Sequence, residues 1–241
     1  ASKVAGDPIN ATVATRLGLK ANKTLRRVNF SNMSLNELHV LPILGGISNN
    51  ETLMEIAISD MMFDEPCCLQ FATAIEVCTS LRRLTARNCH MGPQGGGLVT
   101  DIIERCRDRL TYIDLSDNIM GANAMEPVAR GLTSPDCVIE ELVLAGNELD
   151  EEGGVTIVKT LRVNKSLTSL NLSNNFFTAR VGVVLADSVK SYISDGQIVE
   201  GTKLHKIIIN DNPQIGARSA RNLISAFATE WTEHIEMRNI G

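Results

Sequence analysis

The sequence predicts an α/β solenoid, a curved right-handed β-α superhelix with parallel strands on its concave face and helices on its convex face. Apolar residues in the spacing L-x-x-L-x-L-x-x-N-x-L recur along nearly the whole chain, with first positions at residues 25, 53, 81, 110, 139, 167 and 204. Five of the six steps are therefore 28 or 29 residues, which indicates an internal repeat. Because one unit alone cannot bury its apolar edge, we expect the units to stack around one continuous core.

Each unit is predicted to contain a short strand, a turn, a helix and a return. In the fifth unit the strand carries Leu142 and Leu144, the turn carries Asn147, and the helix carries Ile157 and Leu161. An apolar pair at positions i and i+4 marks one face of a helix, and such a pair recurs in every unit. Seven residues after the Asn position most units have a small residue, which is predicted to let the helix lie close against the strand; examples are Gly96, Gly154 and Gly182.

The two ends and one long step complete the domain organisation. Residues 9–23 are predicted to be the helix and return of a preceding half-unit, and Ile235, Met237 and Ile240 to begin an eighth strand. Neither end shows an obvious polar capping repeat, so residues 1–241 are expected to be one repeat domain from a longer protein. The sixth step is 37 residues, so about nine extra residues lie within 188–201. They are expected to lengthen the helix and then add a loop, which either serves binding or has no role.

A 28–29-residue period with a helix in every copy resembles the leucine-rich repeats of the ribonuclease-inhibitor type, over about residues 9 to 240. The resemblance implies a leucine-rich-repeat solenoid in which four asparagines form a ladder that satisfies backbone groups after each strand, namely Asn118, Asn147, Asn175 and Asn212. The first three units have Met33, Met61 and Cys89 at this position. Their turns are therefore expected to differ locally.

Composition and motifs exclude several classes of function. There are 23 Lys+Arg against 28 Asp+Glu, a net charge of −5, which offers no footprint for nucleic acid or an acidic membrane surface. The longest apolar stretches are too short to cross a bilayer. The glycine-rich segment Gly92–Gly97 opens a predicted helix but lacks the Lys and Ser/Thr of a phosphate-binding loop. No paired C-x-x-C spacing indicates a zinc site and no catalytic arrangement is visible, so we expect neither a metal, a cofactor nor an enzyme.

The cysteines indicate a reducing compartment, and the N-glycosylation sequons do not require a secreted protein. The cysteine positions suit buried free thiols, and no secretory signal is visible, so a cytoplasmic protein is expected, with association with the cytoskeleton as one option. The six are Cys67, Cys68, Cys78, Cys89, Cys106 and Cys137. Seven N-x-S/T sequons occur, at Asn10, Asn22, Asn29, Asn32, Asn50, Asn164 and Asn171. We interpret them as structural, and expect Asn22, Asn50 and Asn164 to end helices in the left-handed conformation.

The concave face is the predicted binding surface, because alternate strand side chains leave the core there; the convex helices, the long loop and a neighbouring domain are the alternatives. Neighbouring strands would let Arg27, Glu55 and Arg83 form a ladder of ion pairs. Charge is sorted along this face, with arginines in units one and three and carboxylates in units four and five, which would orient a charged partner. The candidate partner-binding residues are Arg26, Arg27, Arg82, Arg83, Arg87, Tyr112, Asp114, Glu140 and Glu141.

The predicted function is a non-enzymatic protein–protein interaction module or scaffold whose partner is another protein. The resemblance covers scaffolds, cytoskeletal regulators, immune receptors and enzyme inhibitors, so it does not select one function. An alternative is a GTPase-activating protein for a small GTPase of the Ran type, because the segments Leu115–Gly121 with Glu126-Pro127 and Cys89–Gly96 look like parts of its repeats. A horseshoe inhibitor of a basic enzyme is disfavoured by the small net charge and the arginine-rich end.

Overall fold

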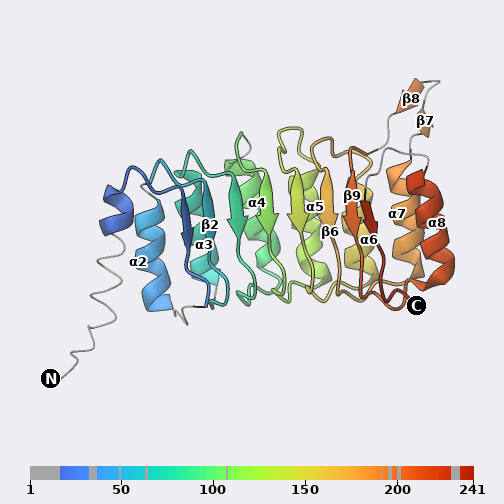
Figure 1. The fold of residues 1–241 in the computed structure, drawn as a ribbon, viewed down its shortest axis with the longest axis horizontal. Coiled ribbons are helices and arrows are strands. Elements are labelled where there is room, and N and C mark those ends of the chain that lie inside the picture. The colour runs from blue at the N-terminus through green and yellow to red at the C-terminus, as the bar shows by residue number, and fades with distance from the viewer. Residues whose placement is uncertain are drawn as a thin grey trace.

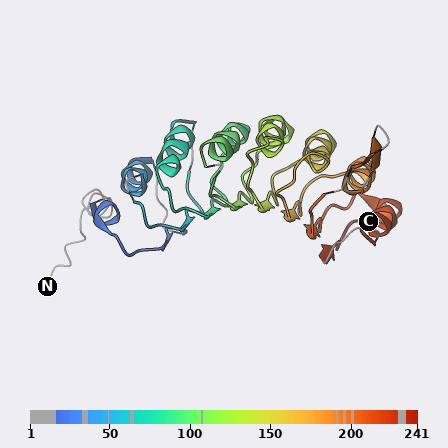
Figure 2. The ribbon, with the colours of Figure 1, turned by 90° about the horizontal axis from the view of Figure 1, so that it is seen from above.

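The structure is a computed structural model that describes residues 17–32, 37–48, 50–62, 65–106, 108–190, 192–194, 197–199, 202–228 and 234–241, with backbone only at 37–39, 65–68, 192–194 and 197–199. Strands and helices alternate along the length of the molecule (Figure 1). Seen from above, the strands line the inner, concave side and the helices form the outer, convex side (Figure 2). The predicted α/β solenoid is confirmed.

Eight strands form one parallel sheet in the order β1-β2-β3-β4-β5-β6-β9-β10. The first seven begin two residues after the first position of a predicted unit. β10 pairs with β9 and is the predicted eighth strand. The strands are β1 (Arg27–Asn29), β2 (Glu55–Ala57), β3 (Arg83–Thr85), β4 (Tyr112–Asp114), β5 (Glu141–Val143), β6 (Ser169–Asn171), β9 (Lys206–Ile208) and β10 (His234–Glu236).

One helix of each unit covers the convex side, and consecutive helices pack against one another. They are α2 (Glu37–Ile47), α3 (Glu65–Glu76), α4 (Gly95–Arg105), α5 (Met125–Leu132), α6 (Glu151–Thr160), α7 (Ala179–Val189) and α8 (Gly216–Ala228). A 3-10 turn, η1 (Ala122–Ala124), precedes α5, and residues 17–21 are also helical. The core between the layers is apolar, and central strand residues such as Ile56, Leu84 and Leu142 are buried.

The asparagine ladder is present as the resemblance implied. The Asn147 amide donates to the carbonyl oxygens of Leu115 at 2.9 Å and Ala145 at 3.2 Å, while its own carbonyl accepts from the backbone N–H of Asn118 at 3.1 Å. In the third unit the Cys89 thiol donates to the Ile58 carbonyl at 3.0 Å, so a thiol fills part of the same role.

The turns after the strands share one backbone feature. The residue before the ladder position has a positive φ in every described unit, which Asn, Asp and Gly tolerate best. The early turns therefore share this backbone feature with the later ones, and the expected local difference is present in the third unit, where a thiol replaces the ladder amide. These residues are Asn32, Asp60, Asn88, Asp117, Gly146, Asn174, Asp211 and Asn239.

The small helix residues have a different role from the one predicted. A Cβ on Gly96 would lie 2.2 Å from the Ala124 carbonyl oxygen, and one on Gly154 would lie 2.7 Å from the Phe177 ring. Both obstacles belong to the next unit. The glycines therefore allow neighbouring units to approach each other on the convex side, rather than letting a helix approach its own strand.

The asparagines before the strands are structural, but the predicted left-handed conformation is wrong, because none of Asn22, Asn50 and Asn164 has a positive φ. Instead the Asn50 side-chain oxygen accepts from the N–H groups of Thr52 at 2.8 Å and Leu53 at 2.9 Å, and its amide donates to the Leu19 carbonyl at 2.7 Å. Asn50 and Asn164 are buried. Asn10 lies outside the described residues.

The long step is accommodated by a hairpin. α7 ends at Val189 without being lengthened, and β7 (Tyr192–Ser194) pairs antiparallel with β8 (Gln197–Val199). The predicted helix extension and loop are therefore wrong. The hairpin projects from the end of the molecule that carries α7 and α8, beyond the helix ends (Figure 1), and β6 still pairs directly with β9.

Candidate functional site

Three neighbouring strands bring the central candidate residues into one row on the concave face. Parallel pairing places Arg83 of β3 opposite Tyr112 of β4, and Tyr112 opposite Glu141 of β5. Their side chains leave the core because the next residue of each strand, such as Leu84, points inward and is buried. The register alone therefore aligns a cation, an aromatic ring and a carboxylate.

Arg83 lies over the Tyr112 ring and reaches past it to Glu141. Its guanidinium carbon is 3.7 Å from the ring centroid, a cation–π contact, and its Nη1 is 3.3 Å from Oε1 of Glu141. Such a contact contributes about 0.5–1 kcal/mol at an exposed site. The ring thus supports an arginine that spans two strand spacings, and all three side chains remain partly exposed.

Asp114, the last residue of β4, is hydrogen-bonded to Tyr112, the central residue of this row. Its side chain is fully buried, and its carboxylate accepts hydrogen bonds from Arg87 Nε at 2.7 Å, from Arg87 Nη2 and from the Tyr112 hydroxyl at 3.1 Å. The other oxygen accepts from the Ser116 N–H at 3.1 Å and hydroxyl at 2.7 Å. Asp114 therefore positions Arg87 and Tyr112 and, unlike the other candidate residues, is not exposed on the concave surface. The sequence analysis missed Ser116.

These contacts affect the protonation of the concave cluster, which consists of Arg83, Arg87, Tyr112, Asp114 and Glu141. The hydrogen bond to Asp114 raises the pKa of Arg87, so its guanidinium stays charged. Burial, and then the charge of Asp114, raise the pKa of the Tyr112 hydroxyl. Tyr112 is thus a protonated donor at neutral pH.

The remaining candidates lie on either side of the row. Arg27 Nε is 3.3 Å from Oε2 of Glu55, so the first pair of the predicted ladder is present, whereas Arg83 contacts Glu141 rather than Glu55. Arg26 and Arg82 are exposed and donate to the backbone carbonyls of Thr52 and Leu81. Among the described residues, neither arginine contacts a carboxylate. Glu140 is exposed beside Glu141.

Next to the cluster the concave face carries a polar hollow of about 740 Å³. Arg87 lies on its wall together with Asp60, Asn88 and Asp117, and Asn88 Nδ2 donates to Oδ1 of Asp60 at 2.9 Å. Because Asp60, Asn88 and Asp117 occupy the positive-φ position of successive turns, the repeat itself builds this wall. The hollow extends the polar surface that the arginines present.

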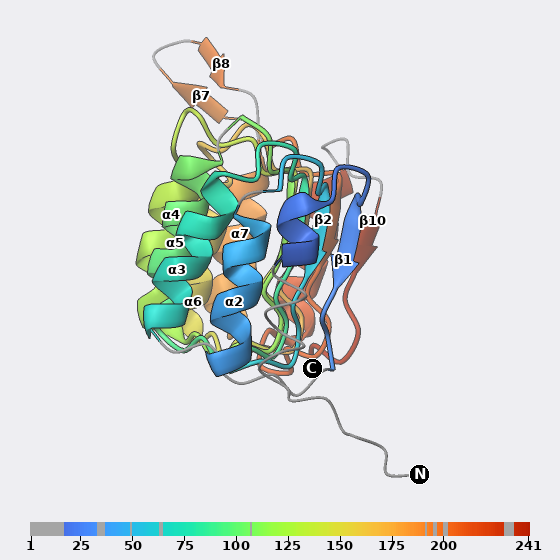
Figure 3. The same ribbon diagram turned by 90° about the vertical axis from the view of Figure 1, so that its left-hand side faces the viewer.

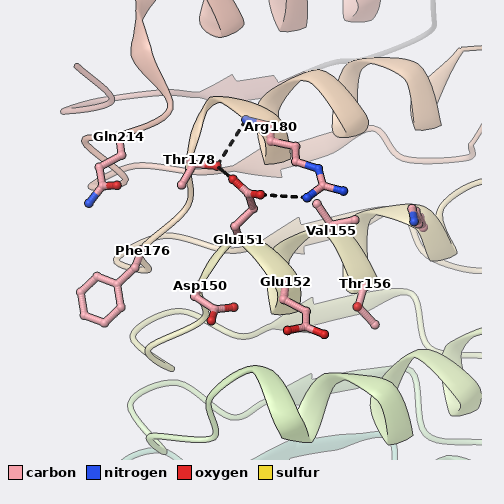
Figure 4. A pocket seen from close by; sticks show the side chains of 10 residues that line it. Asp150, Glu151, Glu152, Val155, Thr156, Phe176, Thr178, Arg180 and Gln214 are labelled. Atoms are coloured by element: carbon pink, nitrogen blue, oxygen red, sulfur yellow. Dashed lines mark hydrogen bonds and ion pairs between the residues drawn. The ribbon is translucent and has the colours of Figure 1, made fainter.

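Another hollow lies where α6 and α7 begin (Figure 4). Glu151 accepts from Thr178 and from Arg180 Nη1 at 2.9 Å, and these bonds lower the pKa of its carboxyl group. Asp150 accepts from the Gly153 N–H at 3.0 Å as the N-cap of α6. These contacts are helix-end interactions, because Glu151 lies in the first turn of α6 and Thr178 is the N-cap of α7.

Within the described part of the chain, no group of three His, Cys, Asp or Glu side chains is placed to hold a metal ion. No helix of that part has the length and apolar character needed to cross a membrane. In the glycine-rich segment Gly92–Gly97, Gly96 lies in the first turn of α4 and packs against Ala124 of the next unit, and this packing role requires no phosphate.

Comparisons with known proteins identify the same kind of repeat in this chain. The family model Leucine Rich Repeat matches residues 166–186. NACHT, LRR and PYD domains-containing protein 2 of Homo sapiens is 28% identical over 52% of this chain and 12% of that protein. Ribonuclease inhibitor of Mus musculus is 25% identical over 58% of this chain and 31% of that protein. NACHT, LRR and PYD domains-containing protein 12 of Mus musculus is 25% identical over 78% of this chain and 17% of that protein. The matched regions are thus less than a third of each relative.

Proposed function

Because the chain is built of leucine-rich repeats of the ribonuclease-inhibitor type, we propose that it is a non-enzymatic interaction module that binds a protein partner through its concave face. The supporting observation is the row Arg83, Tyr112 and Glu141, held over the buried carboxylate of Asp114. Tyr and Arg are common in the energetically dominant part of interfaces, and side chains already held in place lose less conformational entropy on binding.

The exposed charges beside the row define the kind of partner. Arg26 and Arg82 offer cations on one side, and Glu140 offers a carboxylate on the other. A partner with the opposite arrangement, acidic toward β1–β3 and basic toward β5, would be steered into one orientation. Asp114 belongs to this surface only as the residue that positions Arg87 and Tyr112.

An intracellular location fits the chemistry of the cysteines. Cys78 donates its thiol hydrogen to the Ile47 carbonyl at 2.9 Å, and Cys89 donates to Ile58. Both contacts require reduced thiols, which a cytoplasmic environment maintains.

The GTPase-activating alternative gains no support. Leu115, Asn118 and Met120, which carried that similarity, are all buried and belong to the core and the ladder. The similar segments therefore reflect repeat packing, and the relatives named above are inhibitors and NACHT/LRR proteins. A panel of small GTPases supplies the direct check, because accelerated GTP hydrolysis by this chain would favour the alternative.

The concave surface is tested by charge reversal. Arg82→Glu should abolish or strongly weaken capture of the proteins that the wild-type chain retains from cell extract, because Arg82 is exposed and holds no carboxylate of its own among the described residues. Arg130→Glu, at an exposed position on α5, is the matched control and should retain the same proteins. Thermal unfolding should be nearly unchanged for both variants.

Two outcomes would contradict the proposal. Equal capture by wild type and Arg82→Glu would place the interface elsewhere, and a matching loss of folding would mean that Arg82 has a structural role. For a captured protein, affinity measured against salt concentration should fall more steeply for wild type than for Arg82→Glu, because the variant has lost an attractive charge.

A further inference from the structure

The convex side of the N-terminal units carries two apolar hollows on either side of α3. One, of about 340 Å³, lies between α2 and α3 and is lined by Leu41, Leu44 and Leu69. The other, of about 440 Å³, lies between α3 and α4, reaches α5 and is lined by Pro93, Leu98 and again Leu69. Leu69 is 60% exposed on the ridge between them. One exposed leucine is ordinary, but a leucine shared by two apolar hollows makes a continuous surface.

Charge around this surface is predominantly acidic. Among the described residues that line the two hollows, Asp101 is the only ionisable one. The helices α2, α3 and α4 contain five acidic residues, Glu37, Glu65, Glu76, Asp101 and Glu104, and a single arginine, Arg105, which pairs with Glu76. The hollow between α6 and α7 differs, because Lys159 and Arg180 line it. The apolar surface therefore lies in an acidic stretch of the solenoid.

We propose that the surface over α2, α3 and α4 binds a basic amphipathic helix of a protein partner. Figure 1 shows α2, α3 and α4 in consecutive order along the molecule, Figure 3 shows that they lie on the same side of the sheet, and consecutive helices of the three are in contact. Packed helices lie about 8–10 Å apart, and residues i and i+7 of a helix are about 10.5 Å apart along its axis. A helix crossing α3 over Leu69 thus places two of its apolar side chains in the two hollows.

Lys and Arg side chains on the flanks of such a helix would be electrostatically complementary to this surface. Asp101 lies at the second hollow and faces no cation within that lining. Basic flanks would find an excess of carboxylates, because the arginine of these helices is already paired with Glu76, whereas an acidic helix would be repelled. This helix-in-groove contact is on the opposite side of the sheet from Arg83 and Tyr112, so it is independent of the concave surface (Figure 2).

The test uses the 241-residue chain and a fluorescein-labelled peptide of about 18 leucines and lysines with leucine along one helical face. Anisotropy should show saturable binding, weakened at least about tenfold by Leu69→Glu, which places a charge on the ridge. The matched control is Val183→Glu on α7, where the valine is 43% exposed, and this variant should keep the wild-type affinity. Asp101→Lys should also weaken binding, and more strongly at low salt.

A peptide of the same composition in scrambled order separates groove binding from charge attraction. If it binds as tightly as the amphipathic peptide, or if Val183→Glu is as damaging as Leu69→Glu, the proposal is wrong. Sedimentation supplies the remaining outcome: self-association that Leu69→Glu abolishes would make a second copy the occupant, contrary to the proposal. Arg82→Glu should leave peptide affinity unchanged, so failure here and failure of the concave surface can be told apart.

Discussion

A single buried carboxylate organises the concave cluster at the level of individual residues. Asp114 accepts from Arg87, Tyr112 and Ser116, and Arg83 rests on the Tyr112 ring. The sequence predicted that these residues share a face but paired Arg83 with Glu55, the nearest carboxylate along the sheet. It could not predict Glu141, because that choice depends on a ring that supports an extended arginine, and side-chain conformation is set by tertiary packing.

Asp114→Asn should lower the free energy of unfolding by about 2–3 kcal/mol. The amide would place a donor where Arg87 and Tyr112 or Ser116 already donate, in a fully buried site. Urea unfolding measures the loss. Glu140→Gln, at an exposed neighbouring position, is the control and should change stability by less than about 0.5 kcal/mol.

The same substitution has a spectroscopic consequence at Tyr112. Burial and the negative charge of Asp114 both raise the pKa of its hydroxyl, so removing the charge should bring that pKa closer to its ordinary value near 10. The chain has two tyrosines, so Tyr192→Phe isolates Tyr112 for an ultraviolet titration. An unchanged titration in Asp114→Asn would mean that the carboxylate does not contact Tyr112 in solution.

Helices and strands were predictable where apolar spacing is regular, and not where a connection departs from it. Each strand lies where the apolar frame placed it, because a shift by one residue would expose buried residues such as Ile113. The hairpin β7–β8 was missed because the insertion has no counterpart in the other units. A local signal was nevertheless present, since Asp195-Gly196 stands between the two strands and Asp-Gly is a strong two-residue hairpin signal.

Two adjacent glycines of α4 test how neighbouring units pack. Gly96→Ala should lower the free energy of unfolding by about 1–3 kcal/mol, because its Cβ would meet backbone atoms of Ala124. Gly97→Ala should raise it by about 0.5–1 kcal/mol, because nothing lies within 4 Å of its Cβ and alanine favours a helix. Chemical denaturation measures both, and the same sign of change in both variants would contradict the assigned role of Gly96.

At the scale of the whole molecule, stability is expected to come from contacts between successive units. The sheet and the row of helices both follow chain order, so among the described residues the strands and helices of each unit pack against those of the adjacent units, while the Arg83–Glu141 contact skips one unit. A solenoid of this kind is stable as a sum of units and their interfaces. The position of a defect along the arc should therefore decide how much of the molecule it unfolds.

Leu144→Asp and Ile240→Asp place the same charge at the middle and at the end of the core. Leu144 is fully buried between units, so an unpartnered aspartate there should cost more than about 4 kcal/mol and uncouple the two halves. Ile240 is 7% exposed beside the last strand, so its variant should fray only that end. Hydrogen exchange followed by mass spectrometry distinguishes them: protection should fall across β4–β6 and their helices in the first variant and only around β9 and β10 in the second. Equal loss of protection along the whole arc in both variants would show instead that the molecule unfolds as one cooperative unit.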